Sequence, residues 1–471
     1  METAFDRTVD PDLIAWALAP AASGSMWLDP DLLGERPQFD RLPGMMSCDL
    51  LVVGGGYTGL WTALHAAERN PGSRIVLIES ERVGWAASGR NGGFVDPSLT
   101  HGAANGKARW PAEFDELERV ALANFEGMHS DIVGYGMAVD WERTGMLTVA
   151  TEPYQVDKLH RAALSGEGRF LDRDAVRAQV DSPTYRAGLL DPNCAIVNPA
   201  RLVIELARAC AQKGVRIYEH TVARVIDSDS GAVKVVTTAG TVTAGQVVLA
   251  TNVFPSLLRR NRFHTIPVYD YAVATEPLTD DQLDRIGWRS RQGVGDSANQ
   301  FHYYRLSADN RILWGGYDAI YHYGGRVDAR YEDRPESFRK LAAHFFLTFP
   351  QLDDVRFGHR WAGPIDANSR FCAHWGLAER GRVAYSNGFT GLGVAAARFA
   401  ADVCLDLLEG VPTERTELEM VRRRPTPFPP EPVASIGVQA TRWSLDWADH
   451  HGGRRNLFLR TLDRIGLGFD S

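Results

Sequence analysis

The stretch "LLVVGGGYTGLWTALHAAERNPGSRIVLIES", from Leu50 to Ser80, decides the fold. It places Gly54, Gly56 and Gly59 in a G-x-G-x-x-G spacing, directly after a short apolar run that is typical of a buried parallel strand. The residues that follow have helical composition, "NPGS" is a turn, and "RIVLIE" is a second apolar run that closes on Glu79. This order of strand, glycine turn, helix, turn and strand over about 30 residues predicts a Rossmann-type dinucleotide-binding unit.

Each glycine of the turn has its own expected role. Gly54 allows the tight turn, Gly56 lets the backbone approach a pyrophosphate, and Gly59 lets the helix pack closely on the strand. Tyr57 and Thr58 stand at the start of the helix, where backbone N–H groups and the positive end of the helix dipole face the phosphates. We therefore expect this turn to hold the phosphate groups of a dinucleotide.

An acidic residue closes the second strand. Glu79 lies about 20 residues after Gly59, where a carboxylate can accept a hydrogen bond from a ribose hydroxyl, and Ser80 follows it. An ordinary glycine-rich turn would not explain an acid at this place. A carboxylate there also disfavours a 2′-phosphorylated cofactor, but it leaves the choice between NAD and FAD open.

Composition limits the possible partners. The chain has 471 residues, enough for two or more subdomains, and a net charge of −8, so nothing favours binding to nucleic acid or to an anionic membrane. No apolar run approaches the roughly 18 residues of a membrane span. The five cysteines form no Cys-x-x-Cys pair, which favours a reducing compartment and predicts no metal site.

A short apolar segment near the start superficially resembles a signal peptide. "LIAWALAPAA", residues 13–22, has acids rather than a basic segment before it, at Asp6, Asp10 and Asp12. We therefore expect a short docking helix here and a cytoplasmic protein.

A second glycine-rich segment, near the C-terminus, indicates which cofactor is bound. "VAYSNGFTGLGV", residues 383–394, again predicts a strand that runs into a glycine-rich turn. A helix that ends near Gly410 follows it. An NAD enzyme has little use for this second turn, whereas a flavin has a second end to hold, and the helix N-terminus can stabilise negative charge there. The remaining expected cofactor contacts are Ala87, Ser88, Arg90, Asn91, Gly92, Gly93, Val222, Thr251, Asn252, Gly388, Thr390, Gly391, Leu392 and Gly393.

The loop "GWAASGRNGG", after the Rossmann unit, resembles that of the FAD-dependent amine and amino-acid oxidases of the D-amino-acid-oxidase superfamily. Three further stretches are similar to that family: "NPARLVIELARACAQKGVRIYEHTVARV", "FHYYRLSADNRILWGG" and "RVAYSNGFTGLGVAAARFAADVCLDLLEG". The similarity extends over roughly residues 48–412. Within the superfamily, the sequence resembles the γ-glutamylputrescine-oxidase-like and aminophosphonate-oxidoreductase branch. It implies FAD, and the absence of a histidine from "SGRNGG" favours noncovalent binding.

The resemblance implies an α/β fold. A Rossmann-like, glutathione-reductase-like FAD-binding domain would carry an inserted α+β substrate domain on an antiparallel sheet. The residues agree, because Asn198 is a good N-cap and Pro199 suits the first position of a helix that runs to Lys213. The expected parts are an arm at 1–47, an FAD-binding domain at 48–100, 192–264 and 356–412, a substrate domain at 101–191 and 265–355, and a tail at 413–471.

The implied reaction is oxidation of a C–N bond of an amine or amino-acid-like substrate by hydride transfer to the flavin, giving an imine. Molecular oxygen would reoxidise an oxidase, with release of hydrogen peroxide. Two alternatives stay open: a dehydrogenase of the same fold that passes electrons to a quinone or carrier, and a flavin-binding regulatory protein without turnover. The sequence does not separate oxidase from dehydrogenase.

An aromatic strand supplies the candidate catalytic residues. Side chains alternate along a strand, so Tyr303 and Arg305 share one face and Tyr304 lies on the other. The tyrosines could hold an amine by cation–π attraction, and Arg305 could grip a carboxylate or phosphonate. Both roles have a structural alternative. The tyrosines could instead be core residues of the sheet, and Arg305 could form an ion pair with an acid on a neighbouring strand.

Overall fold

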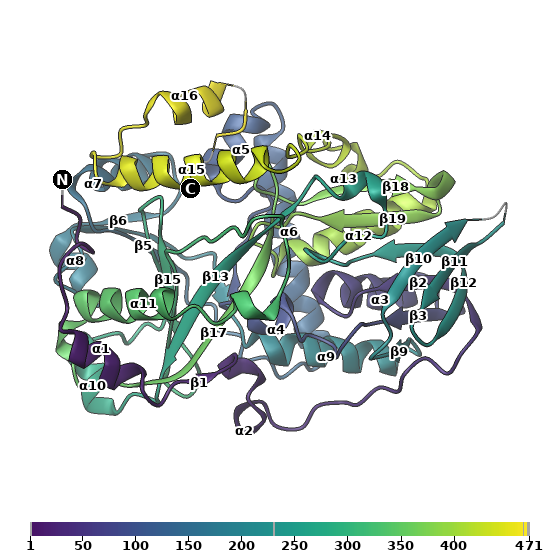
Figure 1. The fold of residues 1–471 in the computed structure, drawn as a ribbon, viewed down its shortest axis with the longest axis horizontal. Helices are drawn as coiled ribbons and strands as arrows, with labels where there is room; N and C mark the ends of the chain where they lie inside the picture. The colour runs from purple at the N-terminus through teal and green to yellow at the C-terminus, as the bar shows by residue number, and fades with distance from the viewer. Residues whose placement is uncertain (1, 229–230, 465, 469–471) are drawn as a thin grey trace.

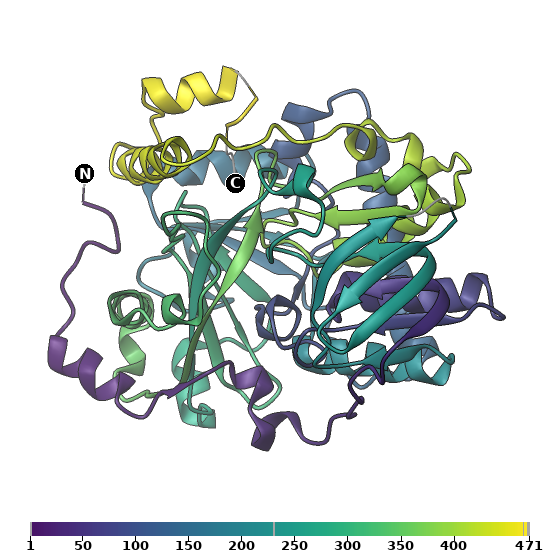
Figure 2. The same cartoon turned by 45° about the vertical axis from the view of Figure 1, so that its right-hand side comes forward.

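Two large β-sheets stand side by side in the computed structural model (Figures 1 and 2). The structure describes residues 2–228, 231–464 and 466–468. The expected arm, FAD-binding domain and tail include seven positions outside the described residues, namely 1, 229–230, 465 and 469–471. Among the described residues, no helix combines the length and apolar character needed to cross a bilayer.

The eight-stranded sheet contains the expected Rossmann unit. Its parallel core runs in the order β19, β12, β2, β3 and β9, and β10, β11 and β18 extend it in antiparallel pairs. Four buried residues of β3 and the last four of β2 form the centre, as the apolar runs predict. The strands are β2 Met46–Val53, β3 Ile75–Ile78, β9 Arg216–Tyr218, β10 Ala223–Ser228, β11 Val233–Thr237, β12 Gly240–Leu249, β18 His374–Ala378 and β19 Val383–Asn387.

Helices α3 (Tyr57–Arg69), α9 (Pro199–Gln212) and α12 (Ala396–Glu409) pack together in the core of this unit. The predicted caps are present in α9: the Asn198 side chain accepts a hydrogen bond from the Arg201 N–H at 3.1 Å, and Pro199 is the first helical residue. Because these start signals are local, the sequence predicted this helix to within one residue.

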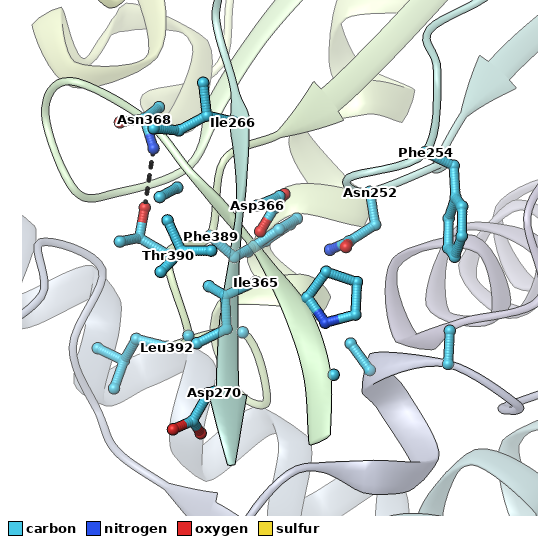
Figure 3. A pocket seen from close by; sticks show the side chains of 18 of the residues that line it. Asn252, Phe254, Ile266, Asp270, Ile365, Asp366, Asn368, Phe389, Thr390 and Leu392 are labelled. Atoms are coloured by element: carbon cyan, nitrogen blue, oxygen red, sulfur yellow. Dashed lines mark hydrogen bonds between the residues drawn. The ribbon is translucent and has the colours of Figure 1, made fainter. Parts of the chain in front are cut away.

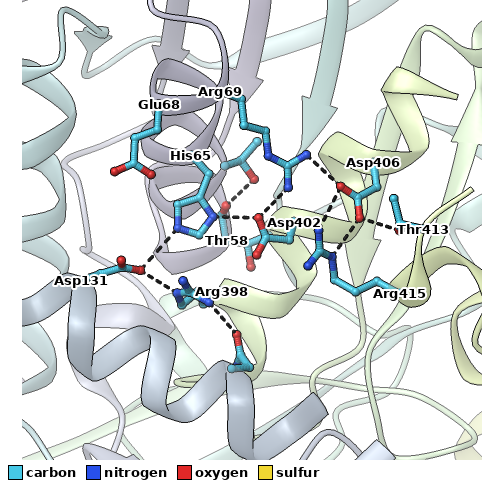
Figure 4. Close-up of polar contacts among 12 residues, drawn as sticks. Thr58, His65, Glu68, Arg69, Asp131, Arg398, Asp402, Asp406, Thr413 and Arg415 are labelled. Atoms are coloured by element: carbon cyan, nitrogen blue, oxygen red, sulfur yellow. Dashed lines mark hydrogen bonds and ion pairs between the residues drawn. The ribbon is translucent and has the colours of Figure 1, made fainter. Parts of the chain in front are cut away.

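A fourth helix, α6 (Phe114–Gly134), packs on the same group, and an ionic network joins it to α3 and α12 (Figure 4). His65 of α3 contacts Asp402 of α12 at 2.9 Å and Asp131 of α6 at 3.6 Å. Arg398 of α12 closes the network on Asp131 at 2.7 Å. The two acids raise the pKa of His65 against the effect of burial, which stabilises its charged form within the network.

The nine-stranded sheet is the expected mostly antiparallel sheet. Its order is β1-β17-β13-β16-β15-β14-β5-β7-β6, and only the β1–β17 and β14–β5 pairs are parallel. Helix α11 (Pro335–Thr348) covers one face with Phe338 and Phe345, against Trp314. The strands are β1 Ala22–Ser23, β5 Met146–Ala150, β6 Arg169–Leu171, β7 Ala187–Asp191, β13 Ile266–Thr275, β14 Gly293–Asp296, β15 His302–Leu306, β16 Ile312–Gly316 and β17 Phe357–Ala367.

The expected domain boundaries differ from this arrangement at two places. Strand β17 falls in the segment 356–412 expected for FAD binding, but it pairs along its length with β13 in the nine-stranded sheet. Helix α6 falls in the segment 101–191 expected for the substrate domain, but it packs on α3 and α12. Strand pairing and helix packing join residues far apart in sequence, so composition along the chain did not reveal either assignment.

The arm and the tail cross from one sheet to the other. The arm contains α1 (Pro11–Leu18), which is the expected short helix, and the tail contains α15 (Val433–Asp449) and α16 (Leu457–Arg464) (Figure 1). The remaining elements are α2 Pro30–Leu33, α4 Ala87–Arg90, β4 Phe94–Val95, α5 Ala103–Arg109, α7 Pro153–Leu164, α8 Arg173–Arg177, β8 Ala195–Ile196, α10 Asp280–Ile286, α13 Glu414–Glu417 and α14 Glu419–Arg422.

Candidate functional site

One large cavity joins the two sheets. It begins at the carboxyl ends of β2, β3 and β12 and reaches β13 and β17 of the nine-stranded sheet (Figure 3). Its volume is about 1550 Å³, whereas pockets for one small ligand measure about 300–1000 Å³. The cavity therefore has room for a dinucleotide together with a substrate.

Most of the expected cofactor residues line this cavity. They are Gly54, Gly56, Tyr57, Thr58, Glu79, Ser80, Ala87, Ser88, Arg90, Asn91, Gly92, Val222, Thr251, Asn252, Thr390, Gly391, Leu392 and Gly393. Three of the expected glycines, Gly59, Gly93 and Gly388, are not among the lining residues. A side chain at any of the three would collide with protein atoms behind the cavity wall.

The first glycine turn has the close contacts that its spacing predicts. Gly54 has φ +116°, and a Cβ there would lie 2.4 Å from the Ala250 carbonyl oxygen. A Cβ on Gly59 would lie 1.9 Å from the Gly54 carbonyl oxygen, so α3 could not pack this closely on β2. A Cβ on Gly56 would meet only the Ser88 Oγ, at 2.8 Å, and would also reduce the space of the cavity.

Glu79 lines the cavity from the end of β3, and backbone and side-chain donors hold its carboxylate. Oε2 accepts a hydrogen bond from the Gly55 N–H at 2.6 Å. Oε1 accepts hydrogen bonds from the Ser80 hydroxyl at 2.8 Å, the Glu81 N–H at 3.0 Å and the Trp85 Nε1–H at 2.8 Å. The side chain is therefore preorganised, with 6% of the residue exposed.

We expect Glu79→Ala to weaken FAD binding by about 1.5–3 kcal/mol, because a charge-assisted hydrogen bond is lost. Glu79→Gln should retain more affinity, since its amide keeps one acceptor for the Gly55 or Trp85 N–H. The measurement is the dissociation constant of FAD from flavin fluorescence, with the melting temperature of the cofactor-free proteins as control. Equal FAD retention in both variants and the parent would remove Glu79 from the cofactor site.

Contacts with α3 and with Glu332 hold the loop after β3 in place. Tyr57 N–H donates to the Ser88 Oγ at 3.0 Å, which ties the loop to the start of α3. Arg90 contacts Glu332 at 2.7 Å and lies beside the ring of Trp85. The polar groups expected to face the cofactor are thus fixed by protein contacts.

The second glycine turn connects β19 to α12 through residues in the left-handed conformation. Gly388, Thr390 and Gly391 all have positive φ, of +81°, +53° and +87°. The loop continues through residue 395, and α12 then runs from Ala396 to Glu409 with Gly410 as its C-cap, so the expected helix follows the glycine segment and ends where the sequence predicts. The left-handed residues direct the chain around the cavity before the helix can begin.

Sequence reasoning missed Asp366, which organises this loop. Its Oδ2 accepts a hydrogen bond from the Gly388 N–H at 2.5 Å, and the Phe389 and Thr390 N–H groups also donate to it. Burial raises the pKa of Asp366 to about 6 against these hydrogen bonds. No motif in the sequence joins this acid on β17 to a loop that follows β19.

On the substrate side of the cavity, Tyr303 faces inward from β15. Its hydroxyl donates to the Oδ2 of Asp270, on β13, at 2.5 Å. Asp270 also points into the cavity (Figure 3). Burial raises the pKa of Asp270 to about 6, while hydrogen bonds from Tyr303 and from the Tyr271 and Gly316 N–H groups lower it. The sequence analysis did not identify Asp270, because only the pairing of β13 with β16 brings it near β15.

Tyr304 does not reach the cavity, contrary to the expectation of a catalytic role. It points to the opposite face of β15, with 1% of its surface exposed, and stacks on Trp314 at 4.3 Å. Its hydroxyl lies 2.6 Å from that of Tyr185. The strand alternation was predicted correctly, and it places Tyr304 in the hydrophobic core.

Arg305 also lies outside the cavity lining, although it shares a face of β15 with Tyr303. Its Nη1 donates to the Val197 carbonyl at 2.7 Å and to the Gly93 carbonyl at 3.2 Å, and its guanidinium lies over the ring of Trp27. The residue is 1% exposed, and burial lowers its pKa to about 10. This position corrects the substrate role expected for Arg305 and supports a structural role, with carbonyl groups rather than an acid as partners.

We therefore expect Arg305→Leu to lower stability without changing substrate recognition. The change removes the donor of the buried Val197 carbonyl, at a cost of about 1–3 kcal/mol, whereas the Gly93 carbonyl keeps its hydrogen bond from the Val197 N–H at 2.8 Å. The melting temperature should fall, while the Michaelis constant of the folded fraction stays the same. The exposed Arg424→Leu is the matched control. A raised Michaelis constant with an unchanged melting temperature would return Arg305 to the substrate site.

The geometry fits FAD from end to end. One glycine turn free of obstructing side chains lies at each of two strand ends, and both turns open on the same cavity. Glu79 offers an acceptor beside the first turn, and the loop held by Asp366 offers backbone groups at the second. A cofactor with a dinucleotide and a distant ring system would use both ends.

Comparison with known proteins agrees with this geometry. The Escherichia coli K12 γ-glutamylputrescine oxidoreductase is 33% identical over 387 residues, which cover 79% of this chain and 86% of that protein. Glycine oxidase from Geobacillus kaustophilus has a similar structure, with a TM-score of 0.65 and 20% identity over 78% of this chain and 96% of that chain. L-proline dehydrogenase from P. horikoshii also has a TM-score of 0.65, with 19% identity, and covers 79% of this chain and 96% of that one.

The family match extends over both glycine turns. The family model described as "FAD dependent oxidoreductase" matches residues 49–407, which contain residues 49–53 of β2, the whole of β3 and the loop that follows β19. The chain therefore belongs to the FAD dependent oxidoreductase family, and its cofactor is FAD.

Proposed function

We propose that the protein oxidises a C–N bond of an amine or amino-acid-like substrate and acts as an oxidase. Bound FAD, held noncovalently, supplies a two-electron acceptor for a hydride from the carbon next to the nitrogen. The nitrogen gives up one proton, and the resulting imine adds water and splits into a carbonyl compound and an amine or ammonia. Molecular oxygen would take the two electrons from the reduced enzyme and form hydrogen peroxide.

The observation that carries the proposal is the carboxylate of Asp270 in a largely apolar part of the cavity. Ile365 and Leu392 lie near it (Figure 3), and Tyr303 donates to its Oδ2. A carboxylate among apolar groups attracts an ammonium group, because little water competes for either charge. Tyr303 orients the carboxylate through its hydrogen bond to Oδ2.

Asp270 can also take up the proton that the reaction must remove. An ammonium group is a poor hydride donor, so the nitrogen must be neutral before the hydride leaves. In an apolar cavity, an ion pair is costly, and transfer of a proton from the nitrogen to the Asp270 carboxylate removes both charges. The raised pKa of Asp270, about 6, favours this transfer.

The names of relatives support a nitrogen-containing substrate. One relative is named for γ-glutamylputrescine, and two similar structures are those of a glycine oxidase and an L-proline dehydrogenase. These names include one oxidase and one dehydrogenase. A dehydrogenase that passes its electrons to a quinone or carrier therefore remains the second candidate.

The test is an anaerobic screen that follows the loss of flavin absorbance with a library of primary and secondary amines, amino acids and aminophosphonates. Matched 2-hydroxy acids serve as controls. Reduction by amines, followed by peroxide formation on admission of air, is the expected result. Reduction by hydroxy acids alone would overturn the proposal, and reduction by amines without peroxide would favour the dehydrogenase. No reduction by any compound would favour a flavin-binding protein without turnover.

The partners proposed for the chain are thus a small-molecule amine and an electron acceptor. Scattered cysteines without a Cys-x-x-Cys pair favour a reducing compartment. The cytoplasmic location accordingly stays a prediction, which fractionation of cells that express the protein would test.

A further inference from the structure

The C-terminal helix α15 forms part of the cavity wall. Val438, Thr441, Arg442 and Leu445 of this helix line the cavity that Asp270 also lines. Figures 1 and 2 show α15 lying across one end of the nine-stranded sheet. The helix follows residue 407, where the family match ends, so it is a feature of this chain outside the matched segment.

Contacts at both ends hold α15 in place without the help of Arg442. Before its first turn, Glu431 accepts hydrogen bonds from the Tyr321 hydroxyl at 2.6 Å and the Gly324 N–H at 3.0 Å. In its last turn, Asp449 accepts hydrogen bonds from the Asn299 N–H at 3.1 Å and the Tyr154 hydroxyl at 2.9 Å. The position of the helix is therefore determined by residues other than its cavity-facing arginine.

Arg442 is a half-buried cation with few protein partners. Its Nη1 donates to the Gln439 side chain, on the same helix, at 3.0 Å. Its Nε is buried and has no hydrogen-bond partner among the described residues. A guanidinium has five N–H donors in a fixed planar arrangement, so most of its capacity is unused here. A buried donor without a partner costs stability, and a ligand that accepts from it recovers that cost.

The acids that influence Arg442 electrostatically form no ion pair with it among the described residues. Asp318 lies close enough to interact with it electrostatically, but already contacts Arg334 at 3.0 Å and Lys340 at 2.9 Å. Asp446, on the next turn of α15, also interacts with Arg442. Burial lowers the pKa of Arg442, with the two acids opposing this shift and Arg334 reinforcing it. Arg334 also contacts Glu336 at 3.9 Å, so the acids of this region pair with Arg334 and Lys340, while the side-chain partner of Arg442 is the neutral Gln439.

The region of Arg442 and the Asp270 carboxylate are connected through one short segment. The Gly316 N–H donates to Asp270 at the end of β16, and Asp318 follows two residues later. A substrate bound at Asp270 by its nitrogen would therefore extend along residues 316–318 toward Arg442. The two ends of this path have opposite charges.

We infer that Arg442 binds an anionic group, a carboxylate or a phosphonate, at the end of the substrate remote from the reacting nitrogen. The planar guanidinium can donate two parallel hydrogen bonds to such a group. The substrate class is then a zwitterion with an amine and an acid separated by a spacer. The inference rests on the proposed function for the reacting end only, since anion binding at α15 can be measured without turnover.

The experiment compares the flavin-loaded parent with Arg442→Gln, Arg442→Lys and the exposed control Arg460→Gln on α16. The substrates are ω-amino carboxylates and ω-amino phosphonates of increasing chain length, each paired with the alkylamine of equal length. We expect Arg442→Gln to raise the Michaelis constant of the best acidic amine about 10- to 100-fold and to leave that of its alkylamine unchanged. Arg442→Lys should retain part of the preference, and Arg460→Gln should behave as the parent.

A second measurement separates this inference from the proposed function. Alkyl carboxylates and alkyl phosphonates, which carry no nitrogen to oxidise, are titrated into the oxidised enzyme by calorimetry. Binding that Arg442→Gln weakens supports the inference even if no amine reduces the flavin, a result that would overturn only the proposed function. Equal effects of Arg442→Gln on both members of each amine pair, or unchanged binding of the alkyl acids, would overturn the inference.

Discussion

Gly56→Val is expected to give a folded, colourless protein that binds no FAD. The Cβ would point into the space between the glycine turn and Ser88, and the branched side chain would fill the surface where a pyrophosphate approaches. The only heavy atoms near that Cβ belong to the Ser88 side chain, which can rotate away. Loss of the cofactor therefore does not require loss of the fold.

The choice of glycine makes this test specific. A Cβ on Gly54 or Gly59 would collide with backbone carbonyl oxygens, so those variants would combine a folding defect with a binding defect. Gly72→Val is the matched control, because a Cβ at Gly72 meets no atom within 4 Å. The measurements are the flavin absorbance per chain after purification and the far-ultraviolet circular dichroism. A yellow Gly56→Val protein with the parent's FAD content would contradict the assigned pyrophosphate site.

Asp270→Asn should lower kcat/KM for amine oxidation by on the order of 100-fold while FAD stays bound. The substitution keeps the shape of the side chain and its contact with Tyr303, but removes the charge that attracts an ammonium group and the site that accepts its proton. Removing one partner of a buried charge pair costs about 2–5 kcal/mol, which corresponds to this loss. The exposed Asp174→Asn is the control.

The dependence of kcat/KM on pH is an independent test of the role of Asp270. The pKa of Asp270 is raised to about 6, so its carboxylate is charged above this pH and takes up a proton as the pH falls through it. In the parent, kcat/KM for amines should therefore fall below about pH 6, and Asp270→Asn should lack this inflection. Asp366 also has a pKa raised to about 6 and remains in the variant. Burial also raises the pKa of Asp96, another cavity residue, to about 7. An inflection that persists in Asp270→Asn would therefore remove Asp270 from proton transfer and assign the titration to another acid of the cavity, such as Asp366 or Asp96.

Local patterns of the sequence determined the FAD-binding end of the molecule. The spacing of Gly54, Gly56 and Gly59 specifies a turn of one shape, and the apolar runs on either side specify buried strands. These features depend on backbone conformation and on neighbours within about 30 residues, so a linear pattern records them. The helix that begins at Pro199 was predicted for the same reason, since its cap lies beside it in the chain.

Which side chains line the substrate end of the cavity was determined by the tertiary structure alone. Strand alternation placed Tyr303 and Arg305 on one face, but it did not say what covers that face at each position. Tyr303 lines the cavity and donates a hydrogen bond to Asp270, while Arg305 donates a hydrogen bond to the carbonyl of Gly93, 212 residues away in sequence.

The side chains that the sequence analysis missed follow the same rule. Asp270 acts with a strand that follows it by a long connection, Asp366 binds a loop from the other sheet, and Arg442 reaches the cavity from the C-terminal tail. Each has its role only because distant segments pack together, and neither periodicity nor spacing encodes which distant segment comes to lie beside a given residue. The cofactor end was therefore determined by local sequence, and the substrate end by long-range packing.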